Sequence, residues 1–397
     1  MTRFRRPCRP RRLAVLAAVL SLAFAAGGCG SGSSADPGRV RIGFLASLSG
    51  TYQAVGTDMR DGFQLYLDTH GGKFGGRVVD LVVADEGDGP ATALPAATRL
   101  VKQDRVLALA GIVAGGSYQA VSALTIENKV PLVGANGRPD VKEATWLWHT
   151  SFISDEPGAA IAPYIKNNVN GPVWAIGPDY QGGHDELRGF TDTFTRLGGK
   201  LANPDGKTTW TPFPATTNFL PYFTQIKNSD AKAVYAFYAG KNAIDFVRQY
   251  KQSDVKDLPL YGAFLTEGTV LQAQGASAEG IWNVLNYSPD LDNAANRTFV
   301  DGWRARHADR QPTTFAMASY DAAAVLDKAI AGINGDVTSQ AINDAIGKLG
   351  QIDSPRAPWQ FNRSTHAPVQ KWYLRQVRND GRALSNVNVQ ELATLGG

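Results

Sequence analysis

Two successive series of short β-type runs, each alternating with amphipathic helices, constrain the fold of this chain more than any other feature. In the first series the apolar residues recur at helical spacing, as Met59, Phe63 and Leu67 do. Consecutive parallel strands need a helix between them, so this order predicts a mostly parallel sheet with helices on both faces. The expected strands are residues 40–45, 78–84, 106–110 and 131–134, and the expected helices are residues 58–69, 91–102 and 118–128.

The second series begins at residue 173 and predicts a second sheet of the same kind. Its expected strands are residues 173–176, 233–237 and 260–264, and its expected helices are residues 185–197, 223–228, 243–252, 314–333 and 339–349. Residues 357–384 combine aromatic and turn residues in a pattern typical of a β-hairpin. Two α/β series of this length predict two domains of ordinary size, with the first crossing between them near residues 150–158.

The beginning of the chain has the features of an export signal. Six arginines and no acidic residue precede an apolar run at residues 13–26, which is shorter than the ~20 residues of a membrane span. Small residues then lead to Cys29 in an order similar to the lipobox of bacterial lipoproteins. We therefore expect a signal peptide at residues 1–28, lipidation of Cys29, and a flexible tether at residues 29–38. A plain secretory signal with an incidental cysteine is the alternative, and the general and twin-arginine export routes both stay open.

Charge and cysteine content narrow the classes of function. The chain has 40 Lys and Arg against 36 Asp and Glu, but six of the arginines lie in the expected leader, which leaves 34 against 36. A protein without net basic charge has no electrostatic reason to bind nucleic acid. Once Cys8 is removed with the leader, Cys29 is the only cysteine. This excludes an intramolecular disulfide and a cysteine zinc cluster.

The strand–turn–helix units of the sequence contain no motif for phosphate binding or nucleophilic catalysis. The first unit lacks GxGxxG, and the P-loop-like residues 205–210 have Leu201 where GxxxxGK[ST] needs a glycine. The segment GGSYQ lacks the second glycine of a nucleophile elbow. The five histidines are scattered and form no metal-binding pair. We therefore expect no enzyme activity, no cofactor and no metal site.

The turns after the expected strands have residues suited to holding a small polar ligand. Ligands of open α/β sheets lie at the carboxyl ends of the strands, where these turns are. Backbone N–H groups at the start of the helix near residue 118 can bind a carboxylate, and Glu267 can neutralise an ammonium group. Three tyrosines offer aromatic walls with a polar tip. The candidate binding residues are Ser49, Tyr52, Val55, Gly115, Gly116, Ser117, Asn136, Gly137, Tyr180, Gln181, Tyr238 and Glu267.

Residues 40–87 resemble the opening of the leucine/isoleucine/valine-binding type of periplasmic solute-binding protein. That opening has a strand, a Leu-Ser/Thr-Gly turn, Gly-x-Asp near a helix start, a Gly-Gly-x-x-Gly turn and a strand that closes on acidic residues. Further matching segments are LVKQDRVLALAGIVAGGS, NKVPLVGAN, IGPDYQGGHDELRGF, SAEGIW and ASYDAAAVLDKAI. Their order and spacing extend the resemblance over nearly all of residues 39–397.

The resemblance implies a doubly wound α/β fold with two parallel-sheet lobes, joined by three crossings around a ligand cleft. Lobe one would comprise residues 39–152 and 286–365, and lobe two would comprise residues 153–285 and 366–397.

The resemblance also implies which residues would hold the ligand. In lobe one, residues 115–117 and 136–137 would grip its carboxylate, and Tyr52 or Val55 would face its side chain. The residues implied to close from lobe two are Tyr180, Gln181, Tyr238 and Glu267, with Glu267 facing an ammonium group.

In function, the resemblance implies a solute-binding lipoprotein of an ABC importer, held at the outer face of the bacterial cytoplasmic membrane or in the periplasm. It would deliver a small polar solute, first of all a branched-chain amino acid, to a separate permease and ATPase. Gly115 and Gly116 stand where amino-acid binders of this type often have Ser or Thr. An aromatic or other small carboxylate, or an amide, is therefore the alternative ligand, and a sensory ligand-binding module is the alternative role.

Overall fold

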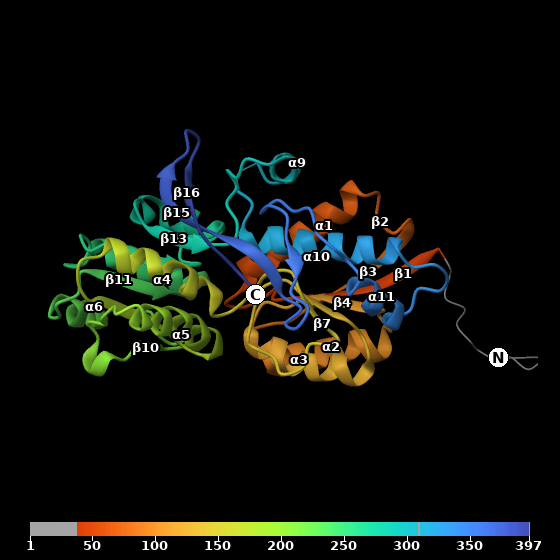
Figure 1. The fold of residues 1–397 in the computed structure, drawn as a ribbon, viewed down its shortest axis with the longest axis horizontal. Helices are drawn as coiled ribbons and strands as arrows, with labels where there is room; N and C mark the ends of the chain where they lie inside the picture. The colour runs from red at the N-terminus through yellow and green to blue at the C-terminus, as the bar shows by residue number, and fades with distance from the viewer. Residues whose placement is uncertain (1–37, 309, 397) are drawn as a thin grey trace, which may run out of the picture. The chain divides into compact units, whose positions relative to one another are not determined.

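The computed structural model describes residues 38–308 and 310–396 (Figure 1). Its first sheet has the strand order β2-β3-β1-β4-β5-β7, and all neighbouring strands are parallel except β2 and β3. These strands are β1 (Arg39–Ala46), β2 (Lys73–Phe74), β3 (Arg77–Asp85), β4 (Ala108–Gly111), β5 (Leu132–Gly134) and β7 (Leu147–His149). A separate two-stranded sheet pairs β6 (Gly137–Arg138) with β8 (Phe152–Ile153).

Helices cover both faces of the first sheet because its central strand is apolar on both sides. Phe44 of β1 packs on Phe63 of α1, whereas the next residue, Leu45, belongs to a cluster with Val121 of α3 on the opposite face. Helices α1 (Gln53–Thr69) and α10 (Thr314–Ala331) form one pair, and α2 (Pro90–Thr98) and α3 (Gly115–Asn128) form the other. Figure 1 shows the first pair on one side of this sheet and the second pair on the other.

The second sheet has the order β10-β9-β11-β12-β13-β15-β14, and β16 pairs with β15. Its strands are β9 (Val173–Asp179), β10 (Thr209–Pro212), β11 (Ala233–Phe237), β12 (Leu260–Ala263), β13 (Trp282–Leu285), β14 (Gln360–Phe361), β15 (Pro368–Asn379) and β16 (Leu384–Leu395). The helices on its two faces are α4 (Glu156–Asn168) and α5 (Gln181–Arg196), and α6 (Leu220–Lys227), α7 (Gly240–Gln252) and α8 (Thr269–Gln274). The predicted two-lobed α/β fold is therefore confirmed, while the exact lobe boundaries stay predictions.

The chain passes between the two sheets after β8, after β13 and before β15, and a buried polar network joins these crossings. The Arg356 guanidinium donates to the Thr150 carbonyl and to Gln370 Oε1. It also pairs with Asp321 Oδ2 at 2.7 Å, and both side chains are almost fully buried. Asn286 donates to the same Gln370 oxygen at 2.8 Å. Because an unpaired buried charge is strongly destabilising, this ion pair fixes the crossings relative to α10.

Several helices begin a few residues before the positions that the sequence pattern predicts. Helix α1 begins at Gln53 instead of residue 58, α3 at Gly115 instead of 118, and α5 at Gln181 instead of 185. Their first turns are rich in glycine and polar residues, so they lack the apolar periodicity that marks a helix in the sequence. The missed turns are those that follow the strand ends, where a ligand would lie.

Some elements were absent from the prediction. Helix α4 contains Pro157 at its start and Pro163 in its interior, and proline is typical of helix interruption rather than helix formation. Strands β10 and β13 have only four residues each, which is too short for a clear alternating pattern. Helix α9 (Ala294–Arg306) was not predicted because it has few apolar residues. Helix α11 (Ser339–Ile346) lies within the helix predicted at residues 339–349.

No helix within residues 38–308 and 310–396 is long and apolar enough to cross a membrane. In the same part of the chain, no group of three or more His, Cys, Asp or Glu side chains could hold a metal ion. The expected signal peptide, Cys29 and all but the last residue of the expected tether lie outside the described residues.

Candidate functional site: a cavity between the two sheets

A cavity of about 60 Å³ lies where the carboxyl ends of strands from both sheets approach each other. Its walls come from segments that follow β1, β4 and β5 in the first lobe and β9, β11 and β12 in the second. This is the edge at which α/β sheets bind ligands. The lining residues are Tyr52, Val55, Val113, Ala114, Gly115, Asn136, Gly137, Phe152, Ser154, Tyr180, Gly182, Glu186, Phe237, Ala239, Phe264 and Phe315.

Aromatic rings form much of the cavity wall, with Phe264 in contact with three others. The ring centroid of Phe264 is 5.3 Å from that of Phe152 and 5.7 Å from those of Phe237 and Phe315. Phe237 meets Phe264 at 89°, edge to face, whereas Phe315 lies nearly parallel to it at 19°. Aromatic rings attract one another in these two geometries. The wall of the cavity on this side is therefore aromatic.

The start of α3 gives the cavity a group of backbone donors. The N–H groups of Val113 and Ala114 donate to the buried Glu86 carboxylate at 2.6 and 2.9 Å. Burial raises the pKa of Glu86 to about 7, and these two amide bonds oppose the shift. The following N–H groups, of residues 115–117, belong to the first helical turn and have no acceptor within the helix. Gly115 lines the cavity, so this helix start can bind an anionic group of a ligand.

Two polar side chains lie near this helix start. Asn136 donates its amide N–H to the Val113 carbonyl at 2.7 Å, which leaves its buried Oδ1 without a partner among the described residues. Asn136 can therefore offer an acceptor at Oδ1, and its second amide N–H is a further donor. The Ser154 hydroxyl, on the first crossing, adds a group that can donate or accept.

Tyr52 of the first lobe and Tyr180 of the second meet at the cavity. Their hydroxyl groups are hydrogen-bonded to each other, and both rings pack on Phe213, with centroid distances of 6.0 and 4.7 Å. Burial raises the pKa of Tyr180 to about 12, so the phenol stays neutral. Close by, a Cβ placed on Gly240 would lie 2.8 Å from the Thr51 carbonyl oxygen. The two lobes are therefore in direct contact beside the cavity.

Glu186, in the second turn of α5, brings a carboxyl group into the cavity. Tyr235 of β11 donates its hydroxyl to Oε1, while Oε2 has no partner among the described residues. The residue is 1% exposed, and this burial raises its pKa to about 8. The Tyr235 hydrogen bond opposes the rise, and the nearby Asp155 carboxylate adds to it. At pH 7 the Glu186 carboxyl is therefore mainly neutral.

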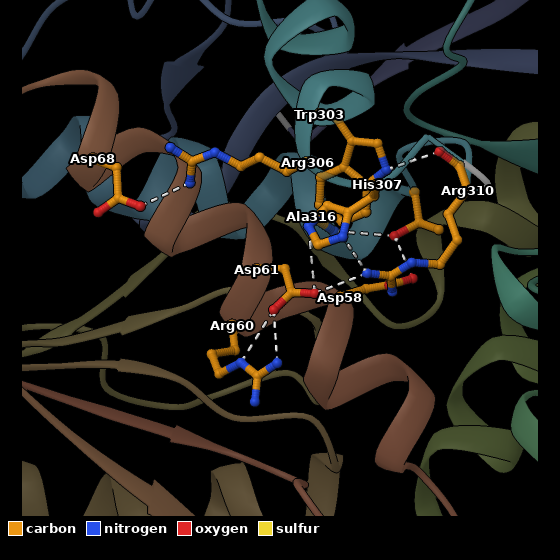
Figure 2. Close-up of polar contacts among 10 residues, drawn as sticks. Asp58, Arg60, Asp61, Asp68, Trp303, Arg306, His307, Arg310 and Ala316 are labelled. Atoms are coloured by element: carbon orange, nitrogen blue, oxygen red, sulfur yellow. Dashed lines mark hydrogen bonds and ion pairs between the residues drawn. The ribbon is translucent and has the colours of Figure 1, made fainter.

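A polar cluster holds α1, whose first turns reach the cavity, against the segment between α9 and α10 (Figure 2). The Arg310 guanidinium pairs with Asp58 at 2.9 Å and with Asp61 at 3.0 Å. Thr313 donates its hydroxyl to the second oxygen of Asp58 at 3.1 Å. Burial raises the pKa of Asp58 to about 7, although the Arg310 charge opposes this. A Cβ on Gly268 of the second lobe would lie 2.8 Å from Asp58, so the cluster also lies against that lobe.

Half of the twelve predicted binding residues line the cavity. Two others are engaged elsewhere: Ser49 donates its hydroxyl to Asp85 at 2.6 Å, and Gln181 donates to Asp185 at 3.0 Å. Ser117 is buried beside Glu86. The residues that line the cavity are Tyr52, Val55, Gly115, Asn136, Gly137 and Tyr180, and Gly116 is not among them.

Tyr238 does not line the cavity, although its two neighbours do. Side chains alternate between the two faces of a strand, and Phe237 and Ala239 line the cavity. Tyr238 instead points into the opposite core, where its hydroxyl lies 3.1 Å from Thr211 Oγ1. The polar tip that made Tyr238 a candidate is therefore used inside the fold.

Glu267 does not reach the cavity either. It lies in an adjoining crevice of about 10 Å³, and Phe264 and Phe315 line both spaces and so stand between them. Arg375 donates to Glu267 Oε1, and both side chains are buried, at 1% and 4% exposed. The Thr314 N–H donates to Oε2 at 3.3 Å. A carboxylate that is already paired in this way is not free to neutralise a ligand ammonium group.

The sequence missed Glu186 because the expected helix began only one residue before it. With α5 starting at Gln181, Gly182 and Glu186 lie four residues apart and share one face of the helix. The aromatic wall was missed for another reason. In the sequence alone, phenylalanines at strand ends and on the first crossing cannot be distinguished from ordinary core residues. Only the topology shows that they lie together.

A family model described as periplasmic binding protein matches residues 39–382. Among curated proteins, the chain is 27% identical over 370 residues to the Leu/Ile/Val-binding protein homolog 6 of Brucella melitensis, an alignment that covers 90% of this chain and 92% of that protein. The homolog 6 of Brucella abortus matches with the same identity and coverage.

Solved structures with similar folds include binders of aromatic acids. A solute-binding protein of an ABC transporter from R. palustris, in complex with benzoate, has a TM-score of 0.82 and 29% identity, covering 90% of this chain and 97% of that one. A second R. palustris protein, in complex with 4-hydroxybenzoate, has a TM-score of 0.81 and 25% identity with the same coverage. A leucine-binding protein from Thermotoga maritima has the same fold, with a TM-score of 0.78 and 20% identity. The match covers 89% of this chain and 98% of that one.

Replacing the paired carboxylate by Glu267→Gln should destabilise the fold, because the Arg375 guanidinium stays buried without its counter-charge. We expect the free energy of unfolding, measured by urea denaturation, to fall by about 3 kcal/mol. The control Glu391→Gln removes an exposed pair with Lys371 and should change it by less than about 1 kcal/mol. If the free energy of unfolding did not change and ligand binding became weaker, Glu267 would be a binding residue and not a structural one.

Proposed function

The chain belongs to the periplasmic binding protein family, and we propose that it captures a small aromatic carboxylate for an ABC importer. The observation that carries this proposal is the cavity wall, in which four phenylalanines and two tyrosines surround a helix start with unbonded amides. The ring of an aromatic acid can pack against such walls, and its carboxylate can accept from the first-turn amides of α3.

The similarity to aromatic-acid binders supports this ligand class. The two solved R. palustris proteins, at 29% and 25% identity, are described in complex with benzoate and 4-hydroxybenzoate. Both match along nearly their whole length, so the comparison includes the segments that form the cavity.

We infer a mechanism of lobe closure. The ligand binds first to one lobe, and its contacts with the other lobe stabilise the closed arrangement that docks on the permease. Closure removes water from the cavity, so the few polar contacts there become stronger. The boundaries that we propose for the moving lobes are those of the sequence analysis, with crossings near residues 152, 285 and 365.

A branched-chain amino acid is the second candidate ligand. The curated relatives are named for leucine, isoleucine and valine, and a ligand ammonium group could pair with the free oxygen of Glu186. Glu267, the ammonium partner that the sequence suggests, is paired with Arg375 instead. For this reason we place the aromatic acid first.

The finer localisation and the partners are also proposals. We propose that the chain is exported, that Cys29 is lipidated at the outer face of the cytoplasmic membrane, and that the permease and ATPase are separate polypeptides. We propose a purely binding role, without enzyme activity, and no nucleic-acid partner.

A thermal-shift screen tests the ligand class. Benzoate at a hundredfold its dissociation constant should add about 2.7 kcal/mol to the free energy of unfolding. Benzamide keeps the ring and lacks the negative charge, so it should stabilise much less. Stabilisation by leucine or isoleucine, with none by benzoate or its hydroxylated forms, would contradict the proposal in favour of the second candidate.

The anchor is tested by Cys29→Ser in cells that express the full chain. Without the thiol no lipid can be attached, so the protein should move from the membrane fraction to the soluble exported fraction. Fractionation and immunoblotting measure the distribution, with the unchanged chain as the control. A variant that stays in the membrane fraction would rule out lipidation at this position.

A further inference from the structure

Glu186 is a buried acid that the proposed mechanism has not yet used. One of its oxygens accepts from Tyr235, and the other, within the cavity wall, has no partner among the described residues. The side chain is 1% exposed, so only a group inside the cavity can pair with that second oxygen. A ligand bound in the cavity can supply such a group.

Glu186 and the amides of α3 come from different lobes. The amides belong to the first lobe, and Glu186 belongs to α5 in the second. Closure therefore brings two distinct polar groups to one cavity whose other walls are largely aromatic. A ligand that meets both needs a polar group besides its carboxylate.

We propose that the Glu186 carboxyl recognises a hydroxyl group on the ring of the bound aromatic carboxylate, and so makes the protein selective for hydroxylated acids. This inference rests on the proposed function. A neutral carboxyl has one O–H donor and further acceptor capacity, and a ring hydroxyl can also donate and accept. The two groups can therefore satisfy each other, whereas an unsubstituted ring leaves the Glu186 oxygen unpaired.

The surroundings of Glu186 favour its neutral form. Burial raises its pKa to about 8, and the Asp155 carboxylate beside α4 acts in the same direction. The groups that face it from β11 and from the turn before α5 are the phenols of Tyr235 and Tyr180, which do not carry positive charge. On its own helix, the Arg188 guanidinium lies 3.5 Å from Asp155 and 3.6 Å from Asp185. A carboxylate ligand in the same cavity would disfavour ionisation of Glu186 further.

Isothermal titration of the full exported chain with benzoate, 3-hydroxybenzoate and 4-hydroxybenzoate tests this selectivity. The unchanged protein should bind one of the hydroxylated acids at least about tenfold more tightly than benzoate. Glu186→Leu should abolish that preference, so that the affinity for the hydroxylated acid falls to about that for benzoate. Glu186→Gln, which keeps a donor and an acceptor in place, should retain part of the preference and covers the case in which the leucine variant does not fold.

The pH dependence provides a second readout. The ratio of the affinity for the hydroxylated acid to that for benzoate should fall as pH rises from 6.5 to 8.5, since Glu186 loses its proton across that range. Glu186→Gln should remove this dependence of the ratio, whereas ionisation of Glu86 beside the α3 amides affects both acids alike. Glu156→Gln is the matched control: Glu156 is buried with a pKa raised by burial to about 8, but it does not line the cavity. This control should keep both the preference and the pH dependence.

Each outcome separates the inference from the proposed function. Binding of all three acids with no hydroxyl preference, or a preference that survives in Glu186→Leu, would overturn the inference and leave the proposed function standing. Leucine binding that strengthens with pH and is lost in Glu186→Gln would assign Glu186 to an ammonium group, and so overturn both. Failure of all three acids to bind would overturn the proposed function, and the inference with it.

Discussion

Polar groups that are buried in an aromatic cavity need partners, and this requirement governs which ligand the chain can select. A buried donor or acceptor without a partner costs about 1–3 kcal/mol, so a ligand that supplies the missing partner gains that energy as specificity. Here the groups are the first-turn amides of α3, Asn136 Oδ1 and Glu186 Oε2. Phe152, Phe237, Phe264 and Phe315 form most of the apolar wall around them. A flat molecule with a carboxylate for the α3 amides and a second hydrogen-bonding group for Glu186 meets two of these conditions together.

The cavity exists only because the chain holds two sheets together at their carboxyl ends. The buried Arg356–Asp321 pair and Gln370 join the crossing segments, and the Arg310 pairs with Asp58 and Asp61 hold α1 in place. These contacts lie outside the cavity, so they can keep the lobes in register while the lobes open and close. In two-lobed proteins of this kind, closure of rigid bodies about a few crossing residues is a common conformational change.

The sequence was sufficient to predict the architecture because alternation and helical periodicity are local signals. The edge of the sheets that forms the site followed from topology alone, and half of the candidate residues line the cavity. The errors came from details that periodicity does not contain. At the end of β11 the alternation of side chains places Phe237 in the cavity wall and Tyr238 in the core. Glu267 pairs with Arg375, which is more than a hundred residues away in the sequence. Because α5 starts earlier than predicted, Glu186 lies in the cavity wall. Such features depend on tertiary contacts between residues that are distant in the sequence.

The central claim is that the lobes enclose an aromatic carboxylate, with its charge on the start of α3 and its ring among the phenylalanines. A crystal structure of the chain grown with 4-bromobenzoate tests this most directly, because the anomalous signal of bromine fixes the orientation of the ring. We predict that the carboxylate lies about 3 Å from at least one backbone nitrogen of the first turn of α3, such as that of Gly115, with the ring against Phe264. A ligand whose carboxylate lies away from the α3 amides, or one bound outside this cavity, would contradict the account.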